Sequence, residues 1–312
     1  MTYTLGIDIG SSAAKLILTD SANNTVYNNC INTTSNPSVT INSLLEQLSN
    51  KFSFSDISGA AISGSGLKQI AAKTGWGHFS VGLALVTSIM HKQPETRTII
   101  CSGGQTVLVV ELEQGMNKPW KVHTNPLCAA GTGHFLQQQC YRLGIQLDDL
   151  ATLANSYNGS APRIATRCSV FAKSDLIHLQ QKGVPVEAML KSLCESIARM
   201  IASLKKGHFQ QPVLFTGGMA ANSAVCSALE TAISARNKQP VSIKVAEMPQ
   251  HVQAFGLSLL ARNTPSSINF VPDETSNTRY YTLPGLPETQ HTNKPPVGTL
   301  PNNSPVYLGI DV

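Results

Sequence analysis

The sequence is poor in charged residues, which make up 13% of its 312 positions, about half the usual share. It also lacks basic clusters, because no run of Lys and Arg exceeds two residues although the net charge is +5. A nucleic-acid-binding surface needs such clusters, so that class of protein is not expected. No apolar run is long enough to span a membrane, and the first residues lack the features of a signal peptide. We therefore expect a cytoplasmic globular protein.

The chain has seven cysteines, an odd number that argues against a disulfide framework in a reducing compartment. Each is then a buried apolar residue, a metal ligand or a reactive thiol. The eight histidines show no paired spacing typical of a metal site. Four cysteines carry no further signal and are expected to be core or surface thiols: Cys30, Cys140, Cys194 and Cys226.

Strand-like and helix-like segments alternate from Met1 to about Arg262, which is typical of an α/β architecture with two lobes. We predict lobe I over about 1–98 together with a final helix at 250–262, and lobe II over about 99–249. Two hairpins are expected at 4–19 and 97–112, with further strands at 59–62, 213–215 and 241–245. Apolar periodicity predicts helices at 40–49, 81–90, 129–143, 170–182, 186–204, 221–233 and 250–261.

The composition changes after residue 262, where eight of the 17 prolines lie among Asn, Thr and Ser. Residues 263–304 are therefore predicted to form an extended linker. The last segment, Val306–Val312, nearly repeats Tyr3–Ile9, since both contain Leu-Gly-Ile-Asp. We expect residues 305–312 to be the truncated start of a second, similar domain, which would make the chain a fragment of a longer protein. A chance match is the alternative.

The first hairpin places Asp8 at the end of an apolar strand, beside a turn that begins with Gly10, Ser11 and Ser12. Backbone N–H groups of such a turn can surround phosphate oxygens, because glycine allows a close approach. Asp8 can hold a hydrated Mg²⁺, and Lys15 on the returning strand can face a phosphate. An ordinary hairpin with a polar turn is the alternative for this segment alone.

Two more glycine turns follow at long intervals. The second hairpin turns at Gly103 and Gly104, next to Gln105, and a strand-to-helix turn carries Gly217 and Gly218. Together the three turns resemble the two phosphate motifs and the adenosine motif of the actin-like ATPase superfamily, which includes sugar kinases and Hsp70. The resemblance implies an actin-like fold that closes on ATP or ADP with Mg²⁺, with the first motif's Asp, Ser and Lys at Asp8, Ser11 and Lys15.

A cysteine segment narrows the resemblance to one family. Cys128-Ala-Ala-Gly131-Thr-Gly133-His-Phe-Leu resembles the signature of the BadF/BadG/BcrA/BcrD ATPases, the activators of 2-hydroxyacyl-CoA dehydratases and benzoyl-CoA reductases. The segment Cys168-Ser-Val-Phe-Ala-Lys-Ser resembles a second block of that family. Gly131 and Gly133 are expected to bring the backbone close to the ligand.

The resemblance implies a function in electron transfer. Members of the family are homodimers that share one [4Fe–4S] cluster, with ligands at positions that match Cys128 and Cys168. They take an electron from a low-potential donor such as ferredoxin or flavodoxin and deliver it, driven by ATP, to an iron–sulfur client enzyme. In a two-domain chain, the second repeat would replace the second subunit. Both cysteines are expected immediately before a helix, where free N–H groups favour an anionic cluster.

The second phosphate motif departs from the family pattern, Asp-x-Gly-Gly-Gln-Asp. Here Cys101 and Thr106 replace both carboxylates, while Gly103, Gly104 and Gln105 remain. Gln105 is then the residue expected to orient the attacking water. The loss of both carboxylates makes ATP hydrolysis a weaker expectation than nucleotide binding. The alternative function is accordingly a diverged nucleotide-binding repeat with weak or no hydrolysis. A small-molecule kinase on the same fold ranks last, because no further catalytic acid is evident.

Overall fold

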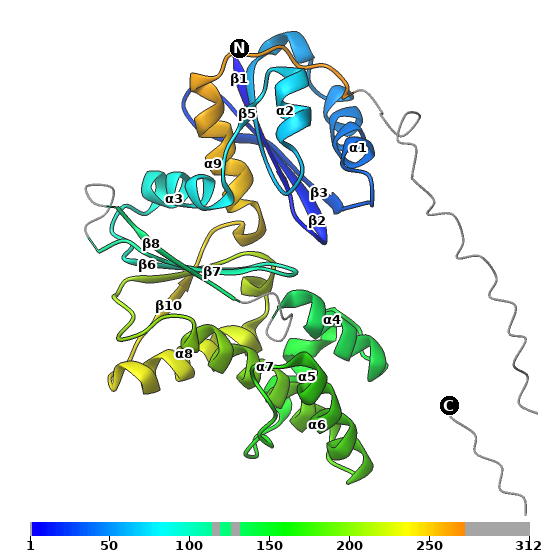
Figure 1. The fold of residues 1–312 in the computed structure, drawn as a ribbon, viewed down its shortest axis with the longest axis vertical. Helices are drawn as coiled ribbons and strands as arrows, with labels where there is room; N and C mark the ends of the chain where they lie inside the picture. The colour runs from blue at the N-terminus through cyan, green and yellow to red at the C-terminus, as the bar shows by residue number, and fades with distance from the viewer. Residues whose placement is uncertain (1, 114–118, 126–131, 272–312) are drawn as a thin grey trace, which may run out of the picture. The chain divides into compact units, whose positions relative to one another are not determined.

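The computed structural model describes residues 2–113, 119–125 and 132–271, and these contain two five-stranded mixed sheets (Figure 1). The first sheet has the strand order β3-β2-β1-β4-β5. Its strands are β1 (Tyr3–Ile9), β2 (Ala13–Thr19), β3 (Thr25–Asn32), β4 (Ile57–Ser63) and β5 (Gly77–His78). The strand β1 pairs antiparallel with β2 and parallel with β4, so the sheet changes direction at its centre.

The second sheet repeats this topology, with the order β10-β9-β6-β7-β8. Its strands are β6 (Thr98–Ser102), β7 (Val107–Glu111), β8 (Lys121–Thr124), β9 (Val213–Thr216) and β10 (Ile243–Val245). The central strand β6 again has an antiparallel hairpin partner on one side and a parallel strand on the other. Each sheet, with the helices that cover it, forms one lobe, here called the first and the second lobe.

Helices cover both sheets. The first lobe contains α1 (Pro37–Ser49), α2 (Lys68–Thr74) and α9 (Val252–Leu260). The second lobe contains α4 (Gly133–Arg142), α5 (Leu150–Ser156), α6 (Ser169–Gln181), α7 (Val186–Ser203) and α8 (Ser223–Asn237). The helix α3 (Val81–Lys92) packs on α9. Short 3₁₀ turns lie at 54–56, 147–149, 218–221, 249–251 and 261–263.

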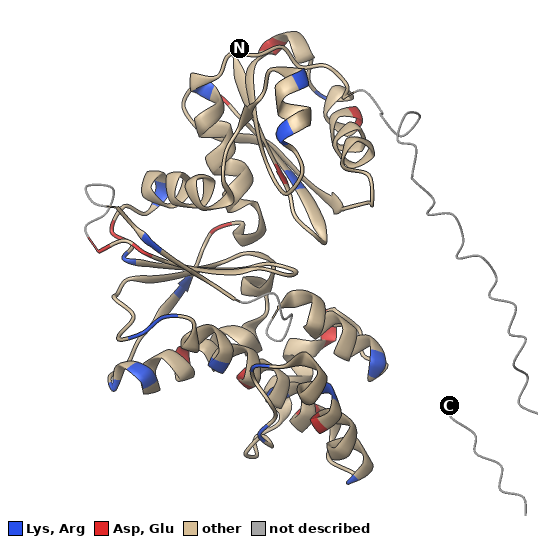
Figure 2. Ribbon diagram, viewed as in Figure 1, with Lys and Arg blue, Asp and Glu red and all other residues tan. Residues whose placement is uncertain are grey.

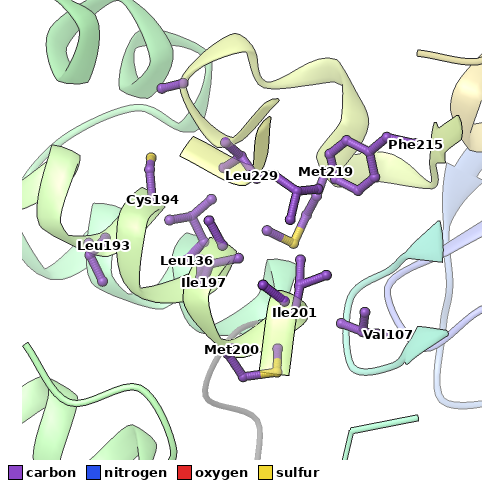
Figure 3. Close-up of a cluster of buried hydrophobic side chains, with 14 of the residues drawn as sticks. Val107, Leu136, Leu193, Cys194, Ile197, Met200, Ile201, Phe215, Met219 and Leu229 are labelled. Carbon is purple, nitrogen blue, oxygen red and sulfur yellow. The ribbon is translucent and has the colours of Figure 1, made fainter. Parts of the chain in front are cut away.

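Apolar cores hold the lobes together. In the first lobe, Leu5 and Ile7 of β1 pack with Leu44 and Leu48 of α1. In the second lobe a larger cluster extends from Val107 of β7 to Cys194 of α7 and Leu229 of α8 (Figure 3). Cys140, Cys194 and Cys226 all belong to this cluster or pack against it. Burial raises the pKa of Cys194 to about 12, so these thiols are protonated at neutral pH.

The helix α9 connects the two lobes in sequence and in space. It lies against β1, β2 and β4 of the first sheet, although more than 230 residues separate it from β1 (Figure 1). Its first residue, Val252, packs in a separate cluster with Ile99 and Leu214 of the second sheet. After α9, Ile268 and Val271 at the start of the proline-rich segment are buried in the first lobe.

Most elements predicted from periodicity are confirmed, including both hairpins and the long helix α7. The helix predicted at 129–143 is present as α4, which begins at Gly133 after Thr132 in extended conformation. The predicted start at Ala129, and Cys128 before it, lie outside the described residues. The sequence did not predict β3, β5, β8, α2 or α5. Figure 2 shows that the Lys and Arg positions are dispersed along the ribbon of the described residues rather than gathered in one stripe.

No helix among the described residues is both long enough and apolar enough to cross a bilayer.

Candidate functional site: a cleft lined by three glycine turns

The first turn holds Asp8 in a defined orientation. Asp8 is the next-to-last residue of β1 and is buried, with 6% of its surface exposed. The Ser63 hydroxyl, at the end of the neighbouring parallel strand β4, donates a hydrogen bond of 2.8 Å to Asp8 Oδ1. Lys15 Nζ lies 3.5 Å from the other carboxylate oxygen and donates to the carbonyl of Ala13 at 3.0 Å. The carboxylate therefore has one neutral and one cationic partner.

The second turn faces the first. A Cβ atom added to Gly104 would lie 2.2 Å from the Ser12 hydroxyl oxygen, so only glycine allows the turns to approach this closely. The second turn also anchors the start of α4, because the N–H groups of Gly133 and His134 donate to the carbonyls of Gly103 and Gly104 at 3.1 and 2.8 Å. The elements that carry the two turns are thus brought together at one place.

The third turn joins the second sheet to the chain that returns to the first lobe. Gly217 has φ +90°, and an added Cβ would lie 2.3 Å from the Ser102 carbonyl oxygen. Both Gly217 N–H and the Thr216 hydroxyl donate to the carbonyl of Pro249, at 2.8 and 2.7 Å. Pro249 begins the short turn that leads into α9, so the third turn is bonded directly to the connection between the lobes.

These turns line one cavity of about 880 Å³, a size within the range of small-molecule sites. It contains most of the residues predicted to bind a nucleotide or act on it: Asp8, Gly10, Ser11, Ser12, Lys15, Gly103, Gly104, Gln105, Gly133 and Gly218. Gly217 directly precedes Gly218 but does not itself line the cavity. Gly131 lies outside the described residues.

Cys101 occupies the end of β6, where the cavity reaches the second sheet. Burial, with a further contribution from the negative charge of Asp8, raises the pKa of its thiol to about 12. The amide Nε2 of Gln253, on α9, donates to Cys101 Sγ at 2.8 Å. Cys101 is therefore a neutral thiol at neutral pH, held by a residue of the first lobe, and it carries none of the negative charge of a carboxylate.

Cys168, the other described cysteine with a predicted ligand role, is not among the cavity-lining residues. It is the N-cap of α6, it is partly exposed, and its side chain makes no capping hydrogen bond. The loop before it is anchored at Ala165, whose N–H donates to Asp175 and whose carbonyl accepts from Ser196, both at 2.8 Å. Cys128 lies outside the described residues. Within the described residues, no three His, Cys, Asp or Glu side chains gather as a metal site.

The model of the BadF/BadG/BcrA/BcrD ATPase family matches residues 5–261. The chain belongs to this family. Among its relatives, the (R)-2-hydroxyglutaryl-CoA dehydratase activating ATPase of Acidaminococcus fermentans is 31% identical over 268 residues, which cover 83% of this chain and 96% of that protein. The solved activator of 2-hydroxyisocaproyl-CoA dehydratase from Clostridium difficile, with bound ADPNP, aligns with a TM-score of 0.72 at 27% identity, covering 84% and 95% of the two chains.

The fold extends beyond this ATPase family. A glucokinase of the ROK family from Streptomyces griseus aligns with a TM-score of 0.53 at 12% identity, over 84% of this chain and 99% of that one. This likeness concerns the fold alone. It confirms the prediction of a two-lobed α/β fold of the actin-like and sugar-kinase type.

Two contacts of this family member's cleft were not predicted from sequence. The hydrogen bond of Ser63 to Asp8 depends on the pairing of β1 with β4. The hydrogen bond of Gln253 to Cys101 joins residues 152 positions apart in the chain. The glycine-rich pattern after β4 was the only sequence signal for the first contact, and there was none for the second.

Proposed function

We propose that the chain is a nucleotide-binding activator domain that serves an iron–sulfur dehydratase or reductase acting on CoA thioesters. The observation that carries this proposal is the cleft, a cavity of about 880 Å³ that is lined by Asp8, Lys15 and the second glycine turn. Membership of an ATPase family and the ADPNP bound by a solved relative support ATP or ADP as the ligand.

We expect the polyphosphate to lie in the cavity beside the first and second turns. Ser11, Ser12 and Gly104 offer hydroxyl and backbone groups there, and Lys15 is the one Lys or Arg among the described lining residues. Asp8, whose oxygens line the same space, is the residue suited to hold Mg²⁺ through its waters. Gln105 lines the same cavity and is the candidate for orienting water. The third turn, which contains Gly218, is the proposed contact for the adenosine part of the nucleotide.

The chain's cysteines suit part of a shared iron–sulfur site. Cys168 presents a partly exposed thiol at the start of the 13-residue helix α6, where helix N–H groups favour a thiolate and an anionic cluster. With Cys128 it would supply two of four ligands, so a second copy of the domain must supply the others. Such a cluster, when bound, stores one low-potential electron. A ferredoxin or flavodoxin is the proposed donor, and the client enzyme the acceptor.

The first test separates nucleotide binding from cluster binding. Titration calorimetry with ATP and ADP should show one site per chain, which Lys15→Met abolishes and the exposed control Lys68→Met does not. Anaerobic reconstitution should yield about four irons per two chains. Cys168→Ser should lose that iron, whereas Cys30→Ser, which changes an exposed cysteine in the first lobe, should keep it. Failure to bind either nucleotide, or equal iron in both cysteine variants, would contradict the proposal.

A second candidate function, nucleotide binding with weak hydrolysis, is favoured by Cys101. The buried neutral thiol cannot accept a proton from water or share the charge of a metal ion, and Thr106 is equally uncharged. In this case the domain responds to bound nucleotide, and a second domain performs hydrolysis.

The double variant Cys101→Asp/Thr106→Asp tests this alternative. If the missing carboxylates limit hydrolysis, phosphate release should rise at least tenfold over the starting protein. The control Cys101→Ser/Thr106→Ser should leave it unchanged. Fast hydrolysis by the unmodified chain would contradict the alternative and favour a fully active ATPase.

A further inference from the structure

A second cavity lies in the second lobe, separate from the nucleotide cleft. It has a volume of about 590 Å³, and none of its lining residues lines the cleft. Its walls are one face of α7, one face of α8 and the segment that ends α5, three elements that pack on one another (Figure 1). We call it the α7–α8 groove. The cavity falls within the size range of ligand pockets, roughly 300–1,000 Å³.

The groove exists because α8 presents short side chains to it. They recur at the spacing of one helix face: Ala224, Ser227, Ala228, Thr231, Ala232 and Ala235. The opposite wall carries long side chains at intervals of four residues on α7, namely Lys191, Glu195 and Arg199. One wall is thus mostly apolar and flat, while the other is charged.

Arg199 is the most incompletely paired group on the charged wall. Its Nη1 pairs with Glu195 Oε2 at 3.3 Å. Its Nε and Nη2 atoms are shielded from solvent and have no hydrogen-bond partner among the described residues. These two nitrogens form the edge of a guanidinium that matches both oxygens of a carboxylate or phosphate. A shielded donor without a partner is unfavourable, so an oxyanion that reaches this edge gains binding free energy.

Lys191 adds a second positive charge to the same wall. Its ammonium donates to the carbonyls of Tyr157 and Gly159 at 2.9 and 3.1 Å, which uses two of its three protons. Against these two cations the described lining residues include one carboxylate, that of Glu195, whose side chain is 34% exposed. The amides of Asn155 and Asn158 line the end of the groove near α5. The groove therefore has a positive wall and a polar end.

We propose that the α7–α8 groove binds an organic acid whose carboxylate or phosphate pairs with the Nε–Nη2 edge of Arg199 and whose apolar chain lies on the alanine face of α8. The nucleotide cleft takes no part in this site, so the proposal does not rest on the proposed activator function. Glu195 occupies only Nη1, so the Nε–Nη2 edge has no partner among the described residues. Because this edge is shielded from solvent, binding requires the neighbouring side chains to shift and admit the oxyanion.

The test uses the full chain and three probes that share a six-carbon tail: hexanoate, hexyl phosphate and 1-hexanol. Ligand-observed NMR should show saturable binding of one or both anions and at least tenfold weaker binding of the alcohol. The anion that binds more tightly identifies the head group. Arg199→Gln should weaken anion binding at least tenfold. Lys244→Gln, which removes one positive charge from the exposed strand β10, should not.

A second variant keeps the test valid if Arg199→Gln unfolds the lobe. Thr231 is exposed on the alanine face, so Thr231→Trp should fill the groove and abolish binding while Arg199 stays in place. ATP affinity, measured in parallel, should remain unchanged in both variants. The proposal is overturned if no probe binds saturably below 10 mM, roughly the weakest affinity of interest. It is also overturned if the alcohol binds as well as the anions, or if Thr231→Trp binds like the unmodified chain.

Discussion

Asp8 shows how the cleft's chemistry depends on single contacts. Its carboxylate lies between the Ser63 hydroxyl and the Lys15 ammonium, near the end of β1. When a phosphate enters, Lys15 can turn to it, because the ammonium is the only cation beside this carboxylate among the described residues. Ser63 then remains to hold Asp8 in place. We therefore expect Ser63 to act as a positioning residue that affects ligand binding through Asp8.

Removal of the Ser63 hydroxyl should weaken binding of the magnesium–nucleotide complex. For Ser63→Ala we expect about a tenfold loss in affinity, on the order of 1.4 kcal/mol, because a hydrogen bond to a charged group is lost. Ser63→Thr, which keeps the hydroxyl, should recover most of it. Calorimetry with and without Mg²⁺ is the measurement, with Ser43→Ala on the exposed face of α1 as control. Equal affinities for the alanine and threonine variants would contradict the role.

His251 gives the fold a predictable pH dependence. It is 5% exposed, at the start of α9, and neither ring nitrogen has a hydrogen bond of good geometry within the described residues. Burial lowers its pKa; the carbonyl of Asn29 opposes this shift and the charge of Lys15 adds to it. Protonation is thus easier in the unfolded chain. The stability contributed by the neutral ring is complete above about pH 6.5 and is lost as the pH falls below it.

The free energy of unfolding should therefore decrease between pH 6.5 and 5.5, with a slope of at most about 1.4 kcal/mol per pH unit. His251→Gln should flatten the slope, and His208→Gln, at an exposed site, should leave it intact. Glu111 acts in a separate, more acidic window. Burial raises its pKa, but the hydrogen bonds from Lys205 and His123 outweigh burial and lower it. Urea unfolding at several pH values checks the prediction, which an unchanged slope in His251→Gln would contradict.

Helices and strands were predictable where apolar residues recur in the sequence with a regular period. The hairpins β1–β2 and β6–β7 alternate around glycine, and α7 carries an apolar stripe over 18 residues. The strands missed were β3, whose outer face is polar, β5, with two residues, and β8, with four. Such short or edge strands are defined by their neighbours rather than by their own residues. The contacts of Ser63 and Gln253 were missed for the same reason, since their partners lie 55 and 152 residues away.

The third glycine turn offers a sharp test at this scale. Gly217→Ala should lower the free energy of unfolding by about 2 kcal/mol or more, because φ is +90° and the new methyl group would collide with the Ser102 carbonyl. Nucleotide affinity should fall with it. Gly218→Ala is the matched control, since an added Cβ there meets no atom within 4 Å. Thermal unfolding of both variants is the measurement, and similar melting temperatures would show that the turn is not constrained.

At the scale of the whole molecule, the two sheets share one strand order and one pattern of directions. The cleft takes one glycine turn from the central hairpin of each sheet, so each lobe contributes one of the two turns proposed to bind phosphate. This architecture was predictable from the spacing of the glycine turns. The α7–α8 groove was not predictable from the sequence. It depends on the sizes of side chains on α7 and α8, and the sequence predicts these helices but not which faces they turn to each other.

Association of two copies should depend on the start of α6. Val170 and Phe171, next to Cys168, are each 66% exposed, which is unusual for large apolar side chains. Phe171→Ser should therefore leave the melting temperature of the apo protein within about 2 °C, because little packing is lost. After anaerobic reconstitution it should reduce the fraction of dimers. Light scattering coupled to gel filtration measures this fraction, with Tyr141→Ser on α4, 88% exposed, as a comparison. An unchanged dimer fraction would contradict the prediction.

The carbonyl of Pro249 receives two bonds from the third glycine turn and stands where the chain returns to the first lobe. A main-chain oxygen cannot be deleted by exchanging a side chain, so a substitution at position 249 does not remove this acceptor. The two donors, Thr216 and Gly217, directly precede Gly218, which lines the cleft. A ligand that displaced them would therefore weaken the attachment of the segment that leads into α9.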